Sequence, residues 1–332
     1  MPLKQLPSIH VVAERAGVSI ATVSRVLNNS KPVNADTRRR VEEAVAALGY
    51  RTNTAGRSLA KSQSRLLMVL VPDFANPFYA QIVQGAESVM HAAGYKLLLT
   101  DATSSGPSHE VAMDAIYNRL VDGVINLAHL DDDPTLHAAL RDLPWVNCSE
   151  YVPESELPYV SIDHRQAAID AVQFLLNRGH RRIGLVSADE TFRWARLRHE
   201  GYVLAIQRAG LAHDPQLVRV AGSLDYEAGA QAVGGLLALL ESPTAVFAVS
   251  DTLAIGAIKA LRRAGRRVPD DVAVLGFDDL PLSAVFEPAL TTVSQPMREL
   301  GAQAAEILLA RLGGERPSSR ILQHQLVVRD SA

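Results

Sequence analysis

The sequence predicts a small all-α head followed by an α/β body with parallel sheets in two similar lobes. A helix-turn-helix pattern fills the first 50 residues, and strands alternate with helices from residue 66 onward. Residues 1–65 hold 11 Lys/Arg against 4 Asp/Glu, whereas the other 267 residues hold 22 against 32. A basic head on an acidic body indicates that the head meets a polyanion.

Length and composition bound the class of protein. A chain of 332 residues fits about two or three domains. Cys148 is the only cysteine, which excludes a disulfide framework and a cysteine-rich zinc site. No apolar run approaches the ~20 residues of a membrane span, and the first residues lack the apolar core of a secretion signal. We therefore expect a cytoplasmic protein.

The first two helices of the head are joined by a tight turn. Gly17 is expected to end the first helix, because glycine adopts positive φ most easily. Ser19 is the expected N-cap of a second helix over 20–27, whose Val23 and Val26 return to the core at helical spacing.

A third helix is expected over 37–48, with Asp36 as its N-cap and Gly49 at its end. Val41 and Ala44 face inward. Three basic side chains project outward: Arg38, Arg39 and Arg40.

The second helix carries small or polar residues on its open face, a pattern that lets a helix enter the major groove of DNA. Arg25 suits a bidentate contact to guanine, worth about 1–3 kcal/mol of discrimination. Thr22, Ser24 and Asn28 suit phosphate contacts, which position a protein without specifying a sequence. The alternative is an ordinary three-helix module with a solvated basic face.

The run A-G-V-S-I-A-T-V-S-R-V-L-N, followed by T-R-R-R-V-E-E-A-V-A-A-L-G-Y, resembles the head of the lactose/galactose repressor (LacI/GalR) family. His10 and Val11 depart from it, since the family usually has a Lys-Asp pair there. The resemblance implies a DNA-binding domain at 8–52 that reads a near-palindromic operator as a homodimer. The predicted DNA-binding residues are Ser19, Ile20, Ala21, Thr22, Ser24, Arg25, Asn28, Arg57 and Leu59.

Residues 53–65 are polar and basic and are predicted to link the two parts. The family resemblance implies a hinge helix here, with Leu59 wedged into the minor groove at a kinked base step. Gly56 replaces the more usual alanine, which costs a helix about 0.5–1 kcal/mol. The alternative is a flexible linker with a stray leucine.

The body alternates short apolar runs with amphipathic stretches. Strands are expected at 66–71, 96–100, 123–127, 145–148, from 160, 182–187, 217–221, 244–249, 272–276, after 290 and at 321–328. Helices are expected at 78–93, 109–120, 165–178, 195–209, 226–240, 252–264 and 297–312. This order predicts parallel sheets in one domain, 66–332. We expect one lobe at about 66–161 plus 294–322 and the other at 163–291 plus 323–332.

Ligands of open parallel sheets bind at the carboxyl ends of the strands, which here means the cleft between the lobes. The loops at these ends lack the sequence motifs of P-loop, dinucleotide-binding, zinc-protease and serine-hydrolase sites. No histidine pair has convincing metal spacing. We therefore expect a binding protein without cofactor or metal, and not an enzyme.

The body is similar to the effector domain of the same family, a fold like that of periplasmic sugar-binding proteins. The matching segments are N-P-F-Y (76–79), R-G-H-R-R-I-G (178–184), R-x-x-G-Y (198–202), S-D-x-L-A-I-G-A (250–257) and G-F-D-D (276–279). E-L-P-Y-V-S-I-D (156–163) and the ending L-V-V-R-D-S look most like its cytidine-repressor branch.

The resemblance implies that Arg198 anchors an effector and that Asp278 accepts hydrogen bonds from ligand hydroxyls. A surface arginine and a helix-capping aspartate are the alternatives. Leu224 stands where many members of the family have an aromatic residue that stacks on the ligand. Either Trp194 supplies that stacking face or the ligand has no flat ring, so both a sugar and a nucleoside remain candidate effectors. The predicted effector-binding residues are Phe78, Tyr79, Ser149, Trp194, Arg198, Leu224, Ser250 and Asp278.

Together these features predict a sequence-specific transcriptional repressor whose operator affinity is controlled by a sugar or nucleoside. Two alternatives stay open. One is a cytoplasmic sugar-binding or sugar-modifying protein with an accessory DNA-binding head. The other is an architectural nucleic-acid binder, for which the acidic body has no evident use.

Overall fold

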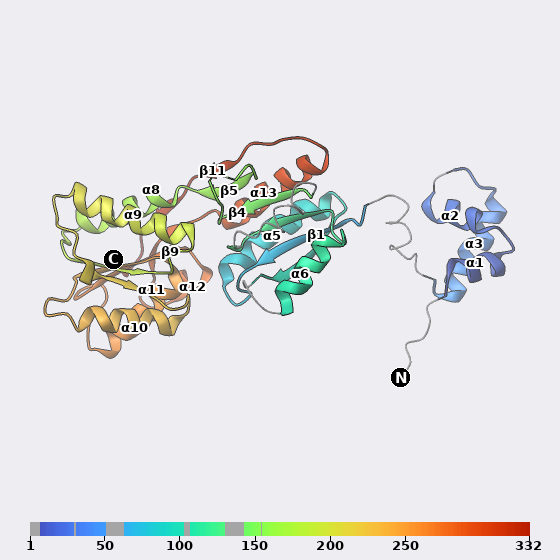
Figure 1. The fold of residues 1–332 in the computed structure, drawn as a ribbon. Coiled ribbons are helices and arrows are strands. Elements are labelled where there is room, and N and C mark those ends of the chain that lie inside the picture. The colour runs from blue at the N-terminus through green and yellow to red at the C-terminus, as the bar shows by residue number, and fades with distance from the viewer. Residues whose placement is uncertain (1–6, 30, 51–62, 103–106, 130–142, 154) are drawn as a thin grey trace. The chain divides into compact units, whose positions relative to one another are not determined.

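The computed structural model describes residues 7–29, 31–50, 63–102, 107–129, 143–153 and 155–332 (Figure 1). The chain divides into two compact units, Met1–Ser64 and Arg65–Ala332, which we call the head and the body. No helix in the described part of the chain is long and apolar enough to cross a membrane.

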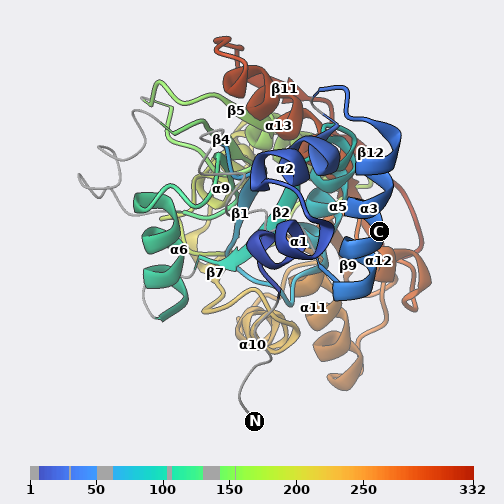
Figure 2. The same ribbon diagram turned by 90° about the vertical axis from the view of Figure 1, so that its right-hand side faces the viewer.

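In the described part of the head, three helices form a bundle: α1 (Ile9–Ala16), α2 (Ile20–Asn28) and α3 (Ala35–Leu48) (Figure 2). As predicted, Gly17 ends α1 with φ 61°, and the Ser19 hydroxyl caps α2 by accepting the Thr22 N–H at 3.2 Å. The buried core consists of Val12, Ala13, Ala16, Val23, Val26, Val41 and Ala44.

The predicted cap of the third helix is wrong. Asn34, not Asp36, is the N-cap of α3, because its Oδ1 accepts the Asp36 N–H at 2.9 Å. The helix therefore begins two residues earlier than expected. Asn and Asp are equally good caps, and Asp36 now lies in the first turn, where a carboxylate suits the helix dipole.

The body contains two six-stranded sheets, each flanked by helices on both faces (Figure 1). The first sheet has the order β11-β5-β4-β3-β1-β2. Helices α5 (Pro77–Ala92) and α13 (Met297–Leu312) cover one face, and α6 (Pro107–Tyr117) covers the other. Its strands are β1 (Leu66–Val71), β2 (Lys96–Asp101), β3 (Gly123–Asn126), β4 (Trp145–Cys148), β5 (Tyr159–Ile162) and β11 (Arg320–Leu322).

The second sheet has the order β12-β10-β9-β8-β6-β7. Helices α8 (His164–Asn177) and α9 (Arg193–Arg208) pack together, as do α10 (Tyr226–Leu237) and α11 (Asp251–Arg263). Its strands are β6 (Ile183–Ser187), β7 (Val218–Val220), β8 (Ala245–Ala248), β9 (Ala273–Asp278), β10 (Thr291–Ser294) and β12 (Gln325–Val327). Two short elements were not predicted: a 3-10 turn (Pro215–Leu217) and α12 (Pro281–Val285).

The chain passes between the sheets three times: after β5, after β10 and between β11 and β12. The single strand predicted at 321–328 is therefore two strands. β11 runs parallel to β5 in the first sheet, whereas β12 runs antiparallel to β10 in the second. Ser294 still pairs with Asp278, so the return to the first sheet starts after residue 294.

Gly201 lets α9 approach α8 closely. A Cβ atom at this position would lie 2.4 Å from the Arg165 carbonyl oxygen and 2.7 Å from the Ala168 Cβ. Since a backbone atom cannot move aside cheaply, only glycine fits. This contact fixes the distance between the helices that carry His164 and Arg198 of the site described below.

We predict that Gly201→Ala destabilises the body by about 1–3 kcal/mol, because the added methyl overpacks the α8–α9 contact. Chemical denaturation monitored by circular dichroism measures the change. Gly234→Ala is the matched control: it lies inside α10 with nothing within 4 Å of the added Cβ, so it should stabilise by about 0.5–1 kcal/mol. Equal effects of the two substitutions would contradict the packing argument.

Candidate functional site

Arg198 lies on the inward face of α9 and is only 3% exposed. Its guanidinium carbon is 3.5 Å from the centroid of the Phe277 ring and 4.8 Å from that of Trp194. Nη1 donates a hydrogen bond to the Val249 carbonyl and lies 3.8 Å from Asp278 Oδ1. Burial lowers the pKa of Arg198 to about 10, so the side chain stays cationic near neutral pH.

His164 holds the other side of the Arg198 guanidinium. Its Nδ1 lies 3.4 Å from Nε and 3.2 Å from Nη2 of Arg198, and it must accept because a guanidinium only donates. Burial, and then the Arg198 charge, lower the pKa of His164 well below its usual range. The neutral ring then carries its proton on Nε2, which faces Ser161 Oγ at 3.4 Å.

Asp278 ends β9 and faces Arg198 with a strained backbone. Its φ is 119°, and that of Asp279 is 61°. Such angles cost non-glycine residues about 1–3 kcal/mol each and persist where the surroundings hold them. The pKa of Asp278 is raised to about 7, and burial is the largest cause. The charge of Asp251 adds to the rise, whereas Arg198 and the hydrogen bond from Gln295 oppose it. Gln295 donates to Asp278 Oδ1 at 2.8 Å.

Asp251 anchors the turn that follows Asp278. Its Oδ2 accepts the Leu280 N–H at 2.8 Å and the Ser283 hydroxyl at 2.6 Å, while Oδ1 accepts the Thr292 hydroxyl at 2.5 Å. The carboxylate is completely buried. It thereby joins the start of α11 to β10 and to the turn, and it positions Asp278 without facing Arg198 at bonding distance.

The first lobe contributes Tyr79, near the start of α5. Burial, and then the charges of Asp278 and Glu150, raise the pKa of Tyr79, so its phenol stays neutral and can donate. Phe78 packs edge-on against the Tyr79 ring, with 5.2 Å between centroids. The two side chains are buried and form an apolar wall on this side.

Three further predicted effector-binding residues, Ser149, Ser250 and Leu224, have different structural roles. Ser149 has φ 70°, and its carbonyl accepts the Ser161 hydroxyl at 3.2 Å. Ser250 caps α11 by accepting the Leu253 N–H at 3.3 Å, next to the Val249 carbonyl that holds Arg198. Leu224 is half-buried against the core of the second lobe.

The two alternatives, a surface role for Arg198 and a helix-capping role for Asp278, do not agree with the structure. Arg198 is buried, not a surface residue, and Asp278 caps no helix. Sequence reasoning included Phe277 in the G-F-D-D segment (276–279) but did not select His164 or Gln295. His164 directly follows the E-L-P-Y-V-S-I-D segment (156–163), and that adjacency was the available signal. Gln295 lies in a segment between the lobes, and no sequence pattern indicated that it belongs to the site.

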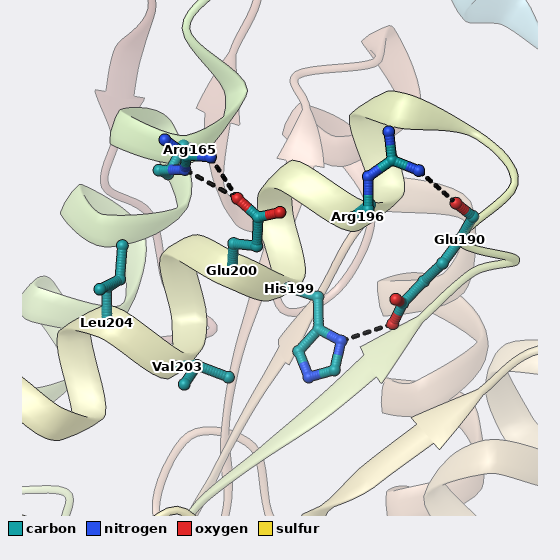
Figure 3. A pocket seen from close by; sticks show the side chains of 7 residues that line it. All are labelled: Arg165, Glu190, Arg196, His199, Glu200, Val203 and Leu204. Atoms are coloured by element: carbon teal, nitrogen blue, oxygen red, sulfur yellow. Dashed lines mark hydrogen bonds and ion pairs between the residues drawn. The ribbon is translucent and has the colours of Figure 1, made fainter.

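A separate depression lies on the opposite face of α9 (Figure 3). Its charged side chains already have partners: Arg165 pairs with Glu200, and His199 Nδ1 lies 2.5 Å from Glu190 Oε1. Arg196 donates to the Glu190 carbonyl at 3.2 Å. This depression is lined from the side of α9 that points away from Arg198, so it is not part of the strand-end site.

The head presents a second candidate surface along α2. Ser19, Ile20, Ala21 and Arg25 are exposed, while Thr22 and Ser24 are half-buried. Arg25 has no ion pair with another described residue. The side chain of Asn28 lies outside the described residues, as do Arg57 and Leu59 of the predicted hinge. No group of three or more His, Cys, Asp or Glu in the described chain is arranged to hold a metal ion.

The fold and the site define a class: a helix-turn-helix head on a two-lobed body with a charged ligand site at the strand ends. Residues 8–53 match the sequence profile "Bacterial regulatory proteins, lacI family", and residues 172–332 match "Periplasmic binding protein-like domain". The chain is 38% identical to the HTH-type transcriptional repressor CytR of Escherichia coli K12, over 96% of this chain and 94% of that one.

Solved structures agree. The lac repressor dimer bound to operator and the anti-inducer ONPF is 30% identical, with a TM-score of 0.87, covering 98% of this chain and 99% of that one. A complex of the regulator CelR with cellobiose is 35% identical, with a TM-score of 0.76, covering 98% and 100%. The chain belongs to the LacI family of bacterial regulatory proteins, and the predicted fold class is confirmed.

Proposed function

We propose that the protein is a transcriptional repressor that binds operator DNA through residues 8–52 and a neutral sugar or nucleoside through residues 66–332. The observation that carries this is the Arg198–Asp278 pair. Both side chains are buried, with Asp278 at the end of β9 and Arg198 within α9, where His164 contacts it. The two charged groups are 3.8 Å apart, too far for a direct hydrogen bond. A ligand hydroxyl that accepts from one and donates to the other fits this gap.

Residues 53–65 are proposed to connect the two parts as a hinge. Ligand binding between the lobes would shift the population of the DNA-competent state by favouring one lobe arrangement. Relatives are named as DNA-binding repressors, and one solved relative holds cellobiose, which supports both halves of the proposal.

The proposed homodimer uses the exposed edge of the first sheet. β2 is the outer strand, and its successive side chains Leu98 and Leu99 are 42% and 44% exposed. A protein normally covers an apolar edge strand of this kind. We propose a second copy of the chain as the cover, and the related lac repressor is also described as a dimer.

An enzymatic role finds no support among these relatives, which are named as transcriptional regulators. We propose a cytoplasmic binding protein whose ligand is released unchanged. Incubation of the protein with each ligand that it binds, followed by mass spectrometry, tests this: a modified product would revive the sugar-modifying alternative.

Arg25→Ala should weaken binding to the operator, selected from random duplex DNA, by about 1–3 kcal/mol, because a bidentate base contact is lost. Fluorescence anisotropy on the operator and on its single-base variants measures this, and specificity should relax at one base pair per half-site. Equal weakening on operator and random DNA would mean that Arg25 contacts phosphate only.

Arg198→Lys should abolish the response to the effector while sparing operator affinity, since lysine keeps the charge but loses the planar fork. A thermal-shift panel of sugars and nucleosides identifies the effector in the wild type, where a ligand at 100 times its Kd adds about 2.7 kcal/mol. Arg196→Lys, on the opposite face of α9, is the matched control and should respond normally. A retained response in Arg198→Lys would remove this residue from the site.

Binding of an uncharged effector should strengthen as pH rises from 6 to 8. Only the ionised Asp278 accepts the ligand hydroxyl fully, and its pKa is raised to about 7 by burial. Affinity should fall up to about tenfold per pH unit below 7 and level off above it. Isothermal titration calorimetry measures the profile. Asp278→Asn should flatten it; an equally steep profile in that variant would assign the titration elsewhere.

A further inference from the structure

Glu150 joins the two lobes at the site. It follows β4 in the first lobe, and its Oε1 accepts the N–H of Arg193, the first residue of α9 in the second lobe, at 2.9 Å. The N-cap residue of α9, Phe192, makes no side-chain cap bond. Glu150 therefore supplies the acceptor that a helix N-terminus needs, from a distant part of the sequence.

The second carboxylate oxygen of Glu150, Oε2, is buried and forms no hydrogen bond to the described residues, and the side chain is 7% exposed. His129 Nδ1, at 3.8 Å, faces the other oxygen, Oε1. A buried acceptor without a donor is costly and is rare in native structures. The Arg193 N–H that Glu150 binds immediately precedes Trp194, whose ring centroid is 4.8 Å from the Arg198 guanidinium carbon, so the carboxylate lies on the same part of α9 as the site. The Glu150 charge also acts on both Tyr79 and Arg198.

A second uncommitted acceptor lies in the same region. Gln295 donates to Asp278 through Nε2, but its Oε1 is buried without a partner among the described residues. Arg198 directs three of its five N–H donors at His164 and at the Val249 carbonyl, which leaves two for a ligand hydroxyl. The site also calls for donors from its ligand, because Glu150 Oε2 and Gln295 Oε1 both lack a donor among the described residues.

The carboxylates around Arg198 disfavour anions. The N-terminus of a helix is a natural anion site, but the first N–H of α9 already binds the Glu150 carboxylate. A phosphate at Arg198 would also meet the carboxylates of Asp278 and Glu150. The nearby cation Arg193 has its guanidinium carbon 4.9 Å from the centroid of the Tyr151 ring, and its Nε is buried without a hydrogen-bond partner among the described residues. Its charge acts on Glu150.

We propose that Glu150 determines ligand specificity: its Oε2 accepts a hydrogen bond from an N–H or O–H donor of an uncharged ligand. This inference rests on the proposed effector site and narrows its ligand. The site takes neutral molecules with donors at this position, such as hydroxyl-rich sugars or nucleosides with an amino group, and rejects their phosphate esters.

The test uses the full-length protein and matched probes in calorimetry. Cytidine with uridine, and adenosine with inosine, differ in presenting an amino or a carbonyl group; cellobiose and glucose represent sugars, with glucose 6-phosphate and the nucleoside 5′-monophosphates as anions. Wild type should bind a donor-bearing neutral probe at least about tenfold more tightly than its carbonyl or phosphorylated counterpart.

Glu150→Gln keeps the shape and one oxygen for the Arg193 N–H but turns an amide NH₂ toward the ligand. Binding of the preferred probe should weaken about 10- to 100-fold, and a nucleoside pair should reverse its order. Glu190→Gln, in the depression of Figure 3, is the matched control and should bind as wild type.

Unchanged affinity and preference in Glu150→Gln would overturn the proposal, and so would a wild type that binds only the anionic probes or none of them. Selection of operator DNA with the same protein preparations distinguishes failure of the Glu150 proposal from failure of the proposed repressor function. Selective DNA binding with unaltered probe preference rejects the role of Glu150 alone, whereas loss of operator selectivity in wild type rejects the repressor itself.

Discussion

The body is organised around a buried cation. Arg198 is enclosed by Phe277, Trp194 and His164, and its charge is balanced by an aspartate 3.8 Å away. A buried charge is expensive unless it is hydrogen-bonded and paired, so every neighbour is constrained. His164 must stay neutral to accept from the guanidinium. Asp278 must hold a left-handed backbone, which Asp251 and Gln295 secure from two further segments.

The same arrangement explains how a ligand can act on both lobes. Arg198 and Asp278 belong to the second lobe, Tyr79 and Glu150 to the first, and Gln295 to a segment that passes between them. The chain crosses between the sheets three times, so a ligand bound here contacts groups on either side of these crossings. A molecule that prefers one lobe arrangement shifts its population, and in the proposed dimer this would alter operator affinity.

Local patterns predicted much of this fold. The strand Trp145–Cys148 and the helix Met297–Leu312 have the predicted bounds, because their apolar periodicity is set within the element itself. Pairing partners are not encoded locally: the apolar run at 321–328 did not reveal that its halves join different sheets. In the site, Arg198 and Asp278 came from motif resemblance. His164, Gln295 and the cap supplied by Glu150 depend on contacts between distant segments, and no spacing in the sequence reports them.

The central claim is that occupancy of the Arg198–Asp278 site and operator binding are coupled. Reciprocity tests it most directly: the ligand's Kd is measured on the free full-length protein and on the protein saturated with operator DNA. The account predicts a change of about 5- to 150-fold, equal to the change in operator affinity at saturating ligand. Identical ligand affinities in the two states would contradict it, even if the ligand binds tightly and the head selects its operator.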